Sequence, residues 1–197
     1  MIMPMILDTT NKSDEELVVL ALKEKDYYRY LMNRYEDKLK RYIKRIAGIG
    51  QDDGDDIIQN AFIKVYIKLN DFDSSFKFSS WIYRITRNET IDHLRRLRTR
   101  PISYSGEDND EAINDIRAEL DIDGDIDRKY LKEIFEKVIS RLDEKYREVI
   151  VLKYFEEKDY REISDILQKP MGTIAILLKR AKEQIRKEAL LNKILTA

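Results

Sequence analysis

The apolar residues of this chain recur every three or four positions through several long segments, and this spacing constrains the fold more than any other feature. Residues 26–46 show it most clearly, at Tyr27, Tyr30, Leu31, Tyr35, Leu39, Tyr42, Ile43 and Ile46. Such a spacing forms one continuous face only on an α-helix. Glycine and proline, with 6 and 3 copies in 197 residues, interrupt few positions. We therefore predict an all-α fold.

The charge distribution divides this helical chain into two parts. Residues 1–100 carry 19 basic and 16 acidic side chains, and residues 129–197 carry 16 basic and 12 acidic ones. The segment between them, 101–128, carries 2 basic and 10 acidic side chains and has no clear helical pattern. This composition is typical of a flexible linker. We predict two small helical domains, 1–100 and 128–197, joined by an acidic flexible linker over 101–127.

The composition excludes several classes of protein. The chain has no cysteine, one histidine, no phosphate-binding glycine loop and no paired carboxylates at metal-ligand spacing. The acidic run at Asp121–Asp125 departs from the EF-hand pattern because its glycine comes fourth rather than sixth. We expect no metal, no cofactor and no enzymatic activity. No segment has the pattern of a signal peptide or a membrane-spanning helix, so we expect a cytoplasmic protein without membrane insertion.

A predicted helix over residues 55–69, capped by Asp55, has two different faces. One face is apolar throughout. The other carries Ile63 and Ile67 among polar side chains, which are Asp56, Gln59 and Asn60. Two interpretations fit this helical wheel equally well. The second face is an exposed surface for a partner, or the helix is buried on both sides inside a bundle.

A basic stripe follows the next predicted helix, residues 79–98. Its core face is formed by Phe78, Trp81, Ile82 and Ile85. Another face carries Arg84, Asn88, Ile91, Arg95 and Arg98 at spacings of four, three, four and three, with Arg87 beside them. A charged run is often only a solvated face. Because this face has no acidic side chains of its own, we favour phosphate binding, and therefore a nucleic-acid partner.

The last third of the chain has the pattern of a helix-turn-helix. A short helix over 160–167, a turn over 168–172 and a long helix over 173–191 follow a helix capped by Asp143. The two helices would pack through Ile163, Ile166, Leu167, Ile174, Leu178, Ala181 and Ile185. The outward positions would be Thr173, Ile176, Lys179, Arg180 and Glu183. An ordinary helical hairpin would give the same pattern.

Both halves together resemble the small, extracytoplasmic-function (ECF) type of bacterial RNA polymerase sigma factor. In the first half the resemblance rests on residues 56–66, 72–73, 78–88 and 92–96. In the second half it rests on residues 142–150, 160–164, 172–174 and 180–181. The two blocks occur in the expected order with a linker between them. The resemblance covers residues 13–187.

The resemblance implies roles for individual residues. Docking on the polymerase clamp would involve Asp56, Gln59, Asn60, Phe62, Ile63 and Ile67. Binding of the −10 promoter element, including a flipped base, would involve Phe72, Ser74, Ser75, Phe76, Lys77, Arg84, Arg87, Asn88, Arg95 and Arg98. Binding of the −35 element would involve Thr173, Ile176, Lys179, Arg180 and Lys182. The implied function is that of a sigma factor, which binds core RNA polymerase and directs promoter-specific transcription initiation by recognising and opening promoter DNA. Core RNA polymerase, promoter DNA and an anti-sigma factor are the implied partners.

One departure from the family pattern lies in the second half. Ala175, Ile176 and Leu177 stand where the family usually has polar and basic side chains, and Gln168 replaces the turn glycine. An apolar side chain can contact a thymine methyl group but lacks the donors of a bidentate base contact, which is worth about 1–3 kcal/mol. We therefore expect −35 recognition that is weak or directed to A/T pairs. A polymerase-independent helix-turn-helix regulator and a degenerate sigma factor that sequesters a partner remain alternatives.

Overall fold

The computed structural model describes residues 11–97 and 138–191, and these segments are helical, with no strand among them. The first segment, here the first module, contains α1 (Asp14–Lys23), η1 (Lys25–Tyr27), α2 (Tyr28–Ala47), α3 (Gln51–Ile67), η2 (Leu69–Asp71) and α4 (Phe78–Leu97). The second module contains a turn of helix at 138–141, α7 (Glu144–Ile150), the π-helical segment η3 (Val151–Phe155), α8 (Tyr160–Leu167) and α9 (Met171–Leu191). The all-α prediction is confirmed. The predicted linker lies outside the described residues.

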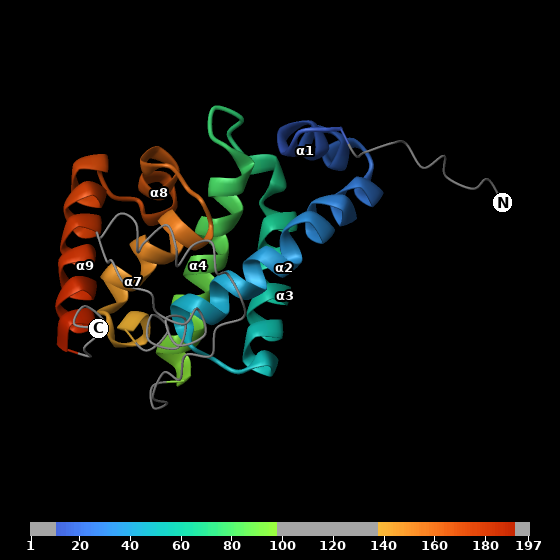
Figure 1. The fold of residues 1–197 in the computed structure, drawn as a ribbon. Helices are drawn as coiled ribbons and strands as arrows, with labels where there is room; N and C mark the ends of the chain where they lie inside the picture. Colours follow the sequence, from blue (N-terminus) through green and yellow to red (C-terminus); the bar gives the residue numbers. More distant parts are fainter. Residues whose placement is uncertain (1–10, 98–137, 192–197) are drawn as a thin grey trace.

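The first module is a helical bundle in which α2, α3 and α4 pack against one another (Figure 1). The predicted apolar positions of α2 are buried, except for Tyr30, which is half-buried. They pack with apolar residues of the facing helices, among them Ile57 and Ile82. Ser13 starts α1 through a capping box, in which its side chain accepts from the Glu16 backbone N–H and its own N–H donates to Glu16. Gly48 ends α2 with a left-handed φ of 60°.

The start of α3 differs from the prediction. The helix begins at Gln51 with Gly50 at the N-cap, so Asp55 lies inside the helix and does not cap it. Gly54 is also helical, although glycine inside a helix costs about 1 kcal/mol relative to alanine. Asp52 and Asp53 in the first turn oppose this cost, because carboxylates are favoured at the positive end of the helix dipole.

The second module has the predicted helix-turn-helix core. The seven apolar positions expected between its helices, Ile163, Ile166, Leu167, Ile174, Leu178, Ala181 and Ile185, are all buried. The turn is shorter than predicted, because α9 begins at Met171 rather than Thr173. Gln168 takes the left-handed conformation with a φ of 52°, at the position where the family has glycine. Asp143 stands at the N-cap of α7, but its side chain makes no capping hydrogen bond.

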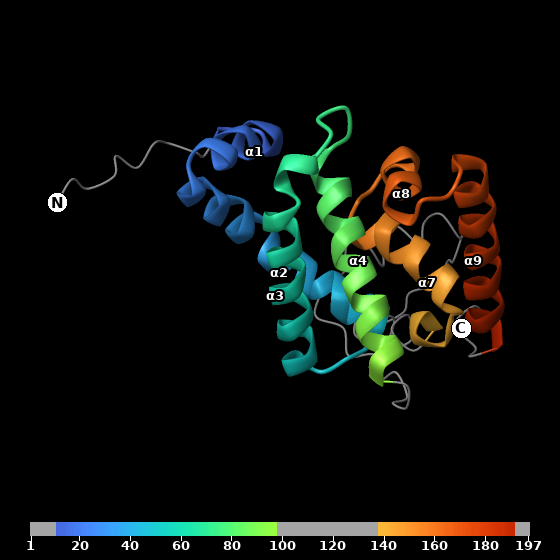
Figure 2. The same ribbon diagram turned by 180° about the vertical axis from the view of Figure 1, so that it is seen from behind.

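The two modules pack directly against each other. Helix α4 lies between α3 on one side and α8 on the other, as both ribbon views show (Figures 1 and 2). Helix α7 and η3 approach the C-terminal half of α2. Arg147 of α7 donates to the backbone oxygen of Ile46 in α2, at 3.2 Å. The sequence pattern predicted the two modules but not this contact between them.

Candidate functional site

The helical wheel of α3 left two interpretations open, and the structure decides between them. Its polar face is exposed, so the helix is not buried on both sides. We call this surface the α3 outer face; it consists of Asp56, Gln59, Asn60, Ile63 and Ile67. Ile63 is 51% exposed and Ile67 is 69% exposed. Two such isoleucines on one open helix face are typical of a partner-binding surface.

Phe62 does not belong to this surface, although the family resemblance placed it there. Its side chain is buried in the stripe that also contains Ile58 and Val65. Its backbone oxygen accepts a hydrogen bond of 2.7 Å from the Tyr28 hydroxyl. Phe62 lies four residues after Ile58, so a helix that buries one of them also buries the other. Its role is to hold α3 against α2.

The loop between η2 and α4 exposes most of the residues predicted for it. Ser74, Ser75, Phe76 and Lys77 are exposed. Phe72 is half-buried, with its ring centroid 5.3 Å from that of Trp81 and 5.5 Å from that of Phe78. Trp81 is a core residue, as predicted from its stripe. Phe76 is therefore the aromatic ring of this loop that is available to a ligand.

A carboxylate shapes the tip of this loop. The Ser75 backbone N–H donates to Asp73 Oδ1 at 2.9 Å, which lowers the pKa of Asp73 and closes a local turn. A small cavity of about 80 Å³ lies beside the loop. Its lining residues come from both modules and are Asp71, Asp73, Phe76, Ser80, Trp81, Arg84 and Asp165. The structure thus brings Phe76 and Arg84 of the predicted −10 site to one place.

The predicted basic stripe on α4 is not uniformly exposed. Asn88 and Arg95 are exposed, Arg84 and Ile91 are half-buried, and Arg98 lies outside the described residues. Arg87 points toward the second module, where its Nε and Nη2 donate to the two carboxylate oxygens of Glu148 at 2.7 and 2.9 Å. Only 18% of the Arg87 side chain is exposed. The acid that faces Arg87 comes from the second module, whereas Arg95 lies 3.4 Å from Asp92 on α4 itself.

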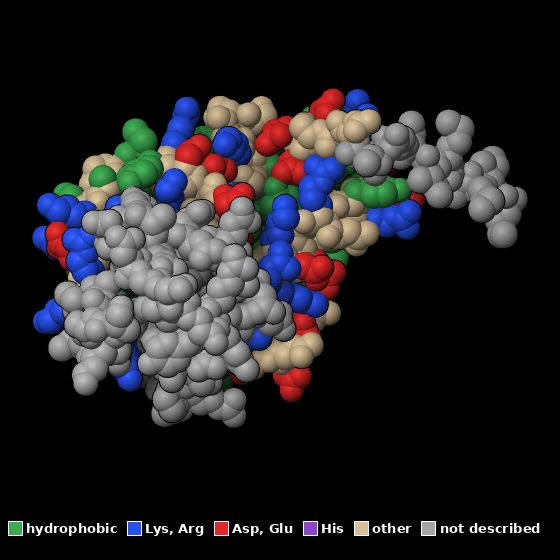
Figure 3. Space-filling view, viewed as in Figure 1, with side chains coloured by type: hydrophobic (Ala, Val, Ile, Leu, Met, Phe, Trp, Pro, Cys, Tyr) green, Lys and Arg blue, Asp and Glu red, His purple; other side chains and the backbone are tan. Residues whose placement is uncertain are grey.

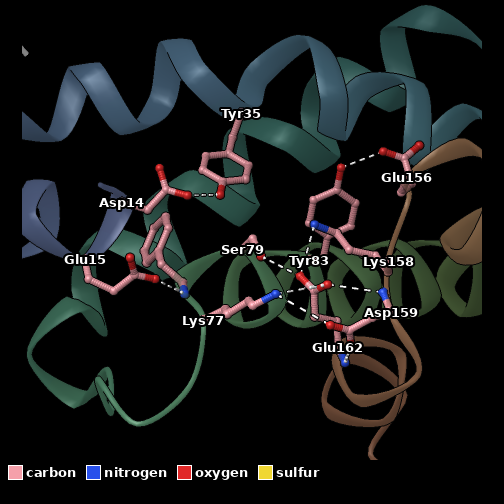
Figure 4. Close-up of polar contacts among 11 residues, drawn as sticks. Asp14, Glu15, Tyr35, Lys77, Ser79, Tyr83, Glu156, Lys158, Asp159 and Glu162 are labelled. Carbon is pink, nitrogen blue, oxygen red and sulfur yellow. Dashed lines mark hydrogen bonds and ion pairs between the residues drawn. The ribbon is translucent and has the colours of Figure 1, made fainter. Parts of the chain in front are cut away.

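Further acidic side chains of the second module contact the first (Figure 4). Glu156 accepts from Tyr83 at 2.6 Å and from Arg45 at 3.1 Å. Glu162 lies 3.3 Å from the Lys77 ammonium group. Sequence reasoning assigned no role to these residues. Glu148 gave no separate signal, because it is one of several charged residues within 142–155.

The second module exposes a recognition helix with a mixed surface. Thr173, Ile176, Lys179 and Arg180 are exposed as predicted, whereas Lys182 is half-buried and has a partner in the structure. Met171 and Ile176 are each more than half exposed. Figure 3 shows hydrophobic side chains where α9 begins, next to α8, and basic side chains further along α9. Of the three departing residues, Leu177 is half-buried and Ala175 and Ile176 face outward.

No group of three or more potential metal-binding side chains occurs within residues 11–97 and 138–191. None of the described helices is both long and apolar enough to cross a membrane.

A helical module with an arginine-bearing helix and an aromatic loop, followed by a helix-turn-helix, is an arrangement typical of a DNA-binding protein. Sigma-70 region 2 matches residues 31–100, and sigma-70 region 4 matches residues 132–185. The chain is 34% identical over 172 residues to the ECF RNA polymerase sigma factor SigW of Bacillus subtilis, which covers 84% of this chain and 90% of that protein. It is 31% identical over 190 residues to the RNA polymerase sigma-H factor of Pseudomonas aeruginosa. This match covers 90% of this chain and 94% of that protein.

The chain belongs to the ECF family of RNA polymerase sigma factors. It therefore directs promoter-specific transcription initiation by RNA polymerase, and its family is not known as a family of enzymes. Two solved structures have the same fold. CnrH in complex with the cytosolic domain of CnrY gives a TM-score of 0.65 at 23% identity, covering 92% of this chain and 98% of that one. The sigma factor RpoE in complex with the anti-sigma factor NepR, from Bartonella quintana, gives a TM-score of 0.59 at 16% identity. This match covers 83% of this chain and 97% of that one.

Proposed function

We propose that this sigma factor divides promoter recognition among three surfaces. The α3 outer face docks on core polymerase, the loop at residues 72–77 and α4 bind the opened −10 strand, and α9 contacts the −35 duplex. The observation that carries the proposal is the position of exposed Phe76 beside a cavity that also contains Arg84, with Asn88 exposed one turn further along α4.

The −10 part of the proposal follows from what promoter opening requires. A base that leaves the stack needs a pocket and an aromatic ring against which it can lie. Phe76 supplies the ring, and the cavity beside it supplies the start of a pocket. Arginines that bind phosphates fix the register of the strand. Arg84 lines the same cavity, and Arg95 lies exposed further along the same helix.

The −35 part of the proposal rests on the exposed face of α9. Lys179 and Arg180 can hold phosphates on either side of the major groove, whereas Ile176 can contact only apolar base edges such as the thymine methyl group. We therefore propose −35 recognition that is directed to A/T pairs and weaker than a polar recognition helix would give. Promoter discrimination then depends mainly on the first module.

A protein partner is also proposed. Both solved structures with this fold are complexes of a sigma factor or a related chain with a second protein, and one of these is named an anti-sigma factor. We propose that an anti-sigma factor regulates this chain as well. We also propose that the chain acts in the cytoplasm, where core RNA polymerase is. Coexpression with the proteins encoded beside it, followed by purification of a stable complex, would test this partner.

The central experiment is run-off transcription with core polymerase and a promoter library. The wild-type chain should direct initiation from a definable set of promoters. Phe76→Ala and Asn88→Ala should reduce open complexes at those promoters while retaining polymerase binding. Asn33→Ala, an exposed change on α2, serves as the matched control and should behave as wild type. If the wild-type chain directs initiation at no promoter, the proposal fails.

A second candidate is a degenerate sigma factor that occupies polymerase without opening promoters. The exposed apolar side chains of Met171, Ala175 and Ile176 on the recognition helix favour it. This candidate predicts tight polymerase binding together with no promoter-dependent initiation, so the same experiment separates the two functions.

A further inference from the structure

A buried hydroxyl group without a partner lines the cavity beside the loop of residues 72–77. Ser80 is only 2% exposed, and its Oγ has no hydrogen-bond partner among the described residues. Most buried hydroxyl groups are hydrogen-bonded, because an unpaired one loses its hydration without replacement. Ser80 lines the same cavity of about 80 Å³ as Phe76 and Arg84. Its hydroxyl is therefore available to a ligand that enters this cavity.

Two carboxylates of the first module line the same cavity. Asp71 belongs to η2, and Asp73 lies in the loop that follows. Asp73 accepts from the Ser75 backbone N–H, whereas the Asp71 side chain makes no hydrogen bond or ion pair with the described residues. An ionised carboxylate accepts hydrogen bonds and donates none, whereas a hydroxyl does both. The cavity thus combines two groups of acceptors with one hydroxyl, that of Ser80.

This combination fits the hydrogen-bonding edge of cytosine. The 4-amino group of cytosine has two donor hydrogens for the carboxylates, and its ring N3 accepts a hydrogen bond from a hydroxyl. Thymine has the acceptor O4 in place of the amino group, so O4 would face the carboxylates. Adenine and guanine also carry donors, but each has two fused rings. Pockets for larger ligands measure roughly 300–1,000 Å³, so a cavity of about 80 Å³ favours the single ring of a pyrimidine.

We propose that this cavity captures a cytosine of the −10 strand, with Asp71 and Asp73 accepting from its 4-amino group and Ser80 donating to its N3. The inference rests on the proposed −10 role of the loop and α4, and it names the base that they select. Phe76 supplies the ring on which this base stacks. All of these groups belong to the first module, so reading the base does not require Asp165, which the second module adds to the cavity.

Two variants separate binding of the base from stability of the fold. Ser80→Ala removes a buried hydroxyl without leaving a partner unsatisfied, so its unfolding temperature should equal that of the wild-type chain or slightly exceed it. It should still bind cytosine less tightly, because the N3 of the captured base loses its donor. Asp71→Asn keeps the shape of the side chain and replaces one carboxylate oxygen by an amide nitrogen, which can donate to O4 of thymine.

Binding is measured with holoenzyme, assembled from core polymerase and the full chain, on a promoter obtained from the run-off library. The −10 region of this DNA is a mismatched bubble, so pairing with the template strand does not contribute to the affinity. An abasic residue, placed at one position of the non-template strand at a time, identifies the captured base by a loss of affinity. At that position, thymine and 2-pyrimidinone, which is cytosine without its 4-amino group, should each bind about tenfold more weakly than cytosine.

The variants are measured on the same set of bubbles. Ser80→Ala should bind the cytosine bubble about fivefold more weakly than the wild-type chain does, and Asp71→Asn should lower the preference for cytosine over thymine to about threefold or less. Asp37→Asn is the matched control, because it removes the same charge at an exposed position of α2. It should keep the full preference.

The outcomes distinguish this inference from the proposed function. If no abasic residue in the −10 region weakens binding, no base is captured, and the proposed −10 role is lost together with the inference. If an abasic residue weakens binding but thymine or 2-pyrimidinone binds as tightly as cytosine, base capture stands and the selection of cytosine is overturned. Wild-type behaviour of both Asp71→Asn and Ser80→Ala would overturn the assignment of these residues.

Discussion

The α3 outer face offers the most direct test of how this sigma factor docks on polymerase. The double change Ile63→Ser and Ile67→Ser removes its apolar side chains. Ile63 is 51% exposed and Ile67 is 69% exposed, so their exposed surface together equals a little more than one whole isoleucine side chain. Burying one such side chain is worth about 1.5–3 kcal/mol, so covering both on docking contributes about 2–3 kcal/mol. Polymerase affinity should therefore fall about 30- to 150-fold.

The assay is competition between each unlabelled variant and fluorescent wild-type chain for core polymerase. Val19→Ser with Leu22→Ser is the matched control, because these α1 residues are 54% and 45% exposed and lose a similar apolar area on another helix. Because both double variants change exposed positions, their unfolding temperatures should be close to that of the wild-type chain. Wild-type affinity of the α3 variant, or an equal loss in the α1 variant, would refute the assignment of this face.

Three further predictions concern stability, pH and DNA. Arg147 is buried and donates to three backbone oxygens, at 3.0–3.2 Å, so Arg147→Met should lower the free energy of unfolding by about 3 kcal/mol in urea titrations. Because burial raises the pKa values of Glu148 and Glu156 in the folded chain, their contribution to the free energy of unfolding should be complete below their ordinary value of 4.5 and should be lost as pH rises through the raised values. Urea titrations across this pH range should show that loss, and the double change Glu148→Gln with Glu156→Gln should remove this part of the pH dependence. Arg180→Ala should weaken binding to −35 duplex DNA. It should also reduce the slope of log affinity against log salt concentration by about 1, and an unchanged slope would exclude a phosphate contact.

The sequence predicted a helix boundary correctly where several local signals indicated the same residue. At the start of α1, the Ser13 cap, its partner Glu16 and an apolar period all indicated the same boundary, and the capping box is present. The prediction failed at the start of α3 because three glycines and three aspartates within residues 48–55 are compatible with several starting points. Propensity alone disfavours Gly54 in a helix, but acids in the first turn favour an earlier start.

The candidate site was predictable wherever a single helix determined it. The helical wheel of α3 places Phe62 in the buried stripe, although the family resemblance had placed it on the surface. The same wheel left the exposure of Ile63 and Ile67 as one of two interpretations, and the structure decided between them. The pairing of Arg87 with Glu148 could not be derived from the pattern of one helix. Its partner Glu148 lies 61 residues away in sequence and on another module, and the periodicity of α4 carries no information about what faces it.

This long-range pairing changes the meaning of the basic stripe. A row of arginines along one face of a helix indicates phosphate binding, but it also attracts any acidic surface of the same chain that can reach it. The first module leans basic, and Glu148, Glu156 and Glu162 lie on the face of the second module that meets it. Buried pairs such as Arg45 with Glu156 contribute little net stability while setting a well-defined geometry. Arg87 and Lys77, which the sequence assigned to DNA phosphates, therefore have carboxylate partners within the chain itself.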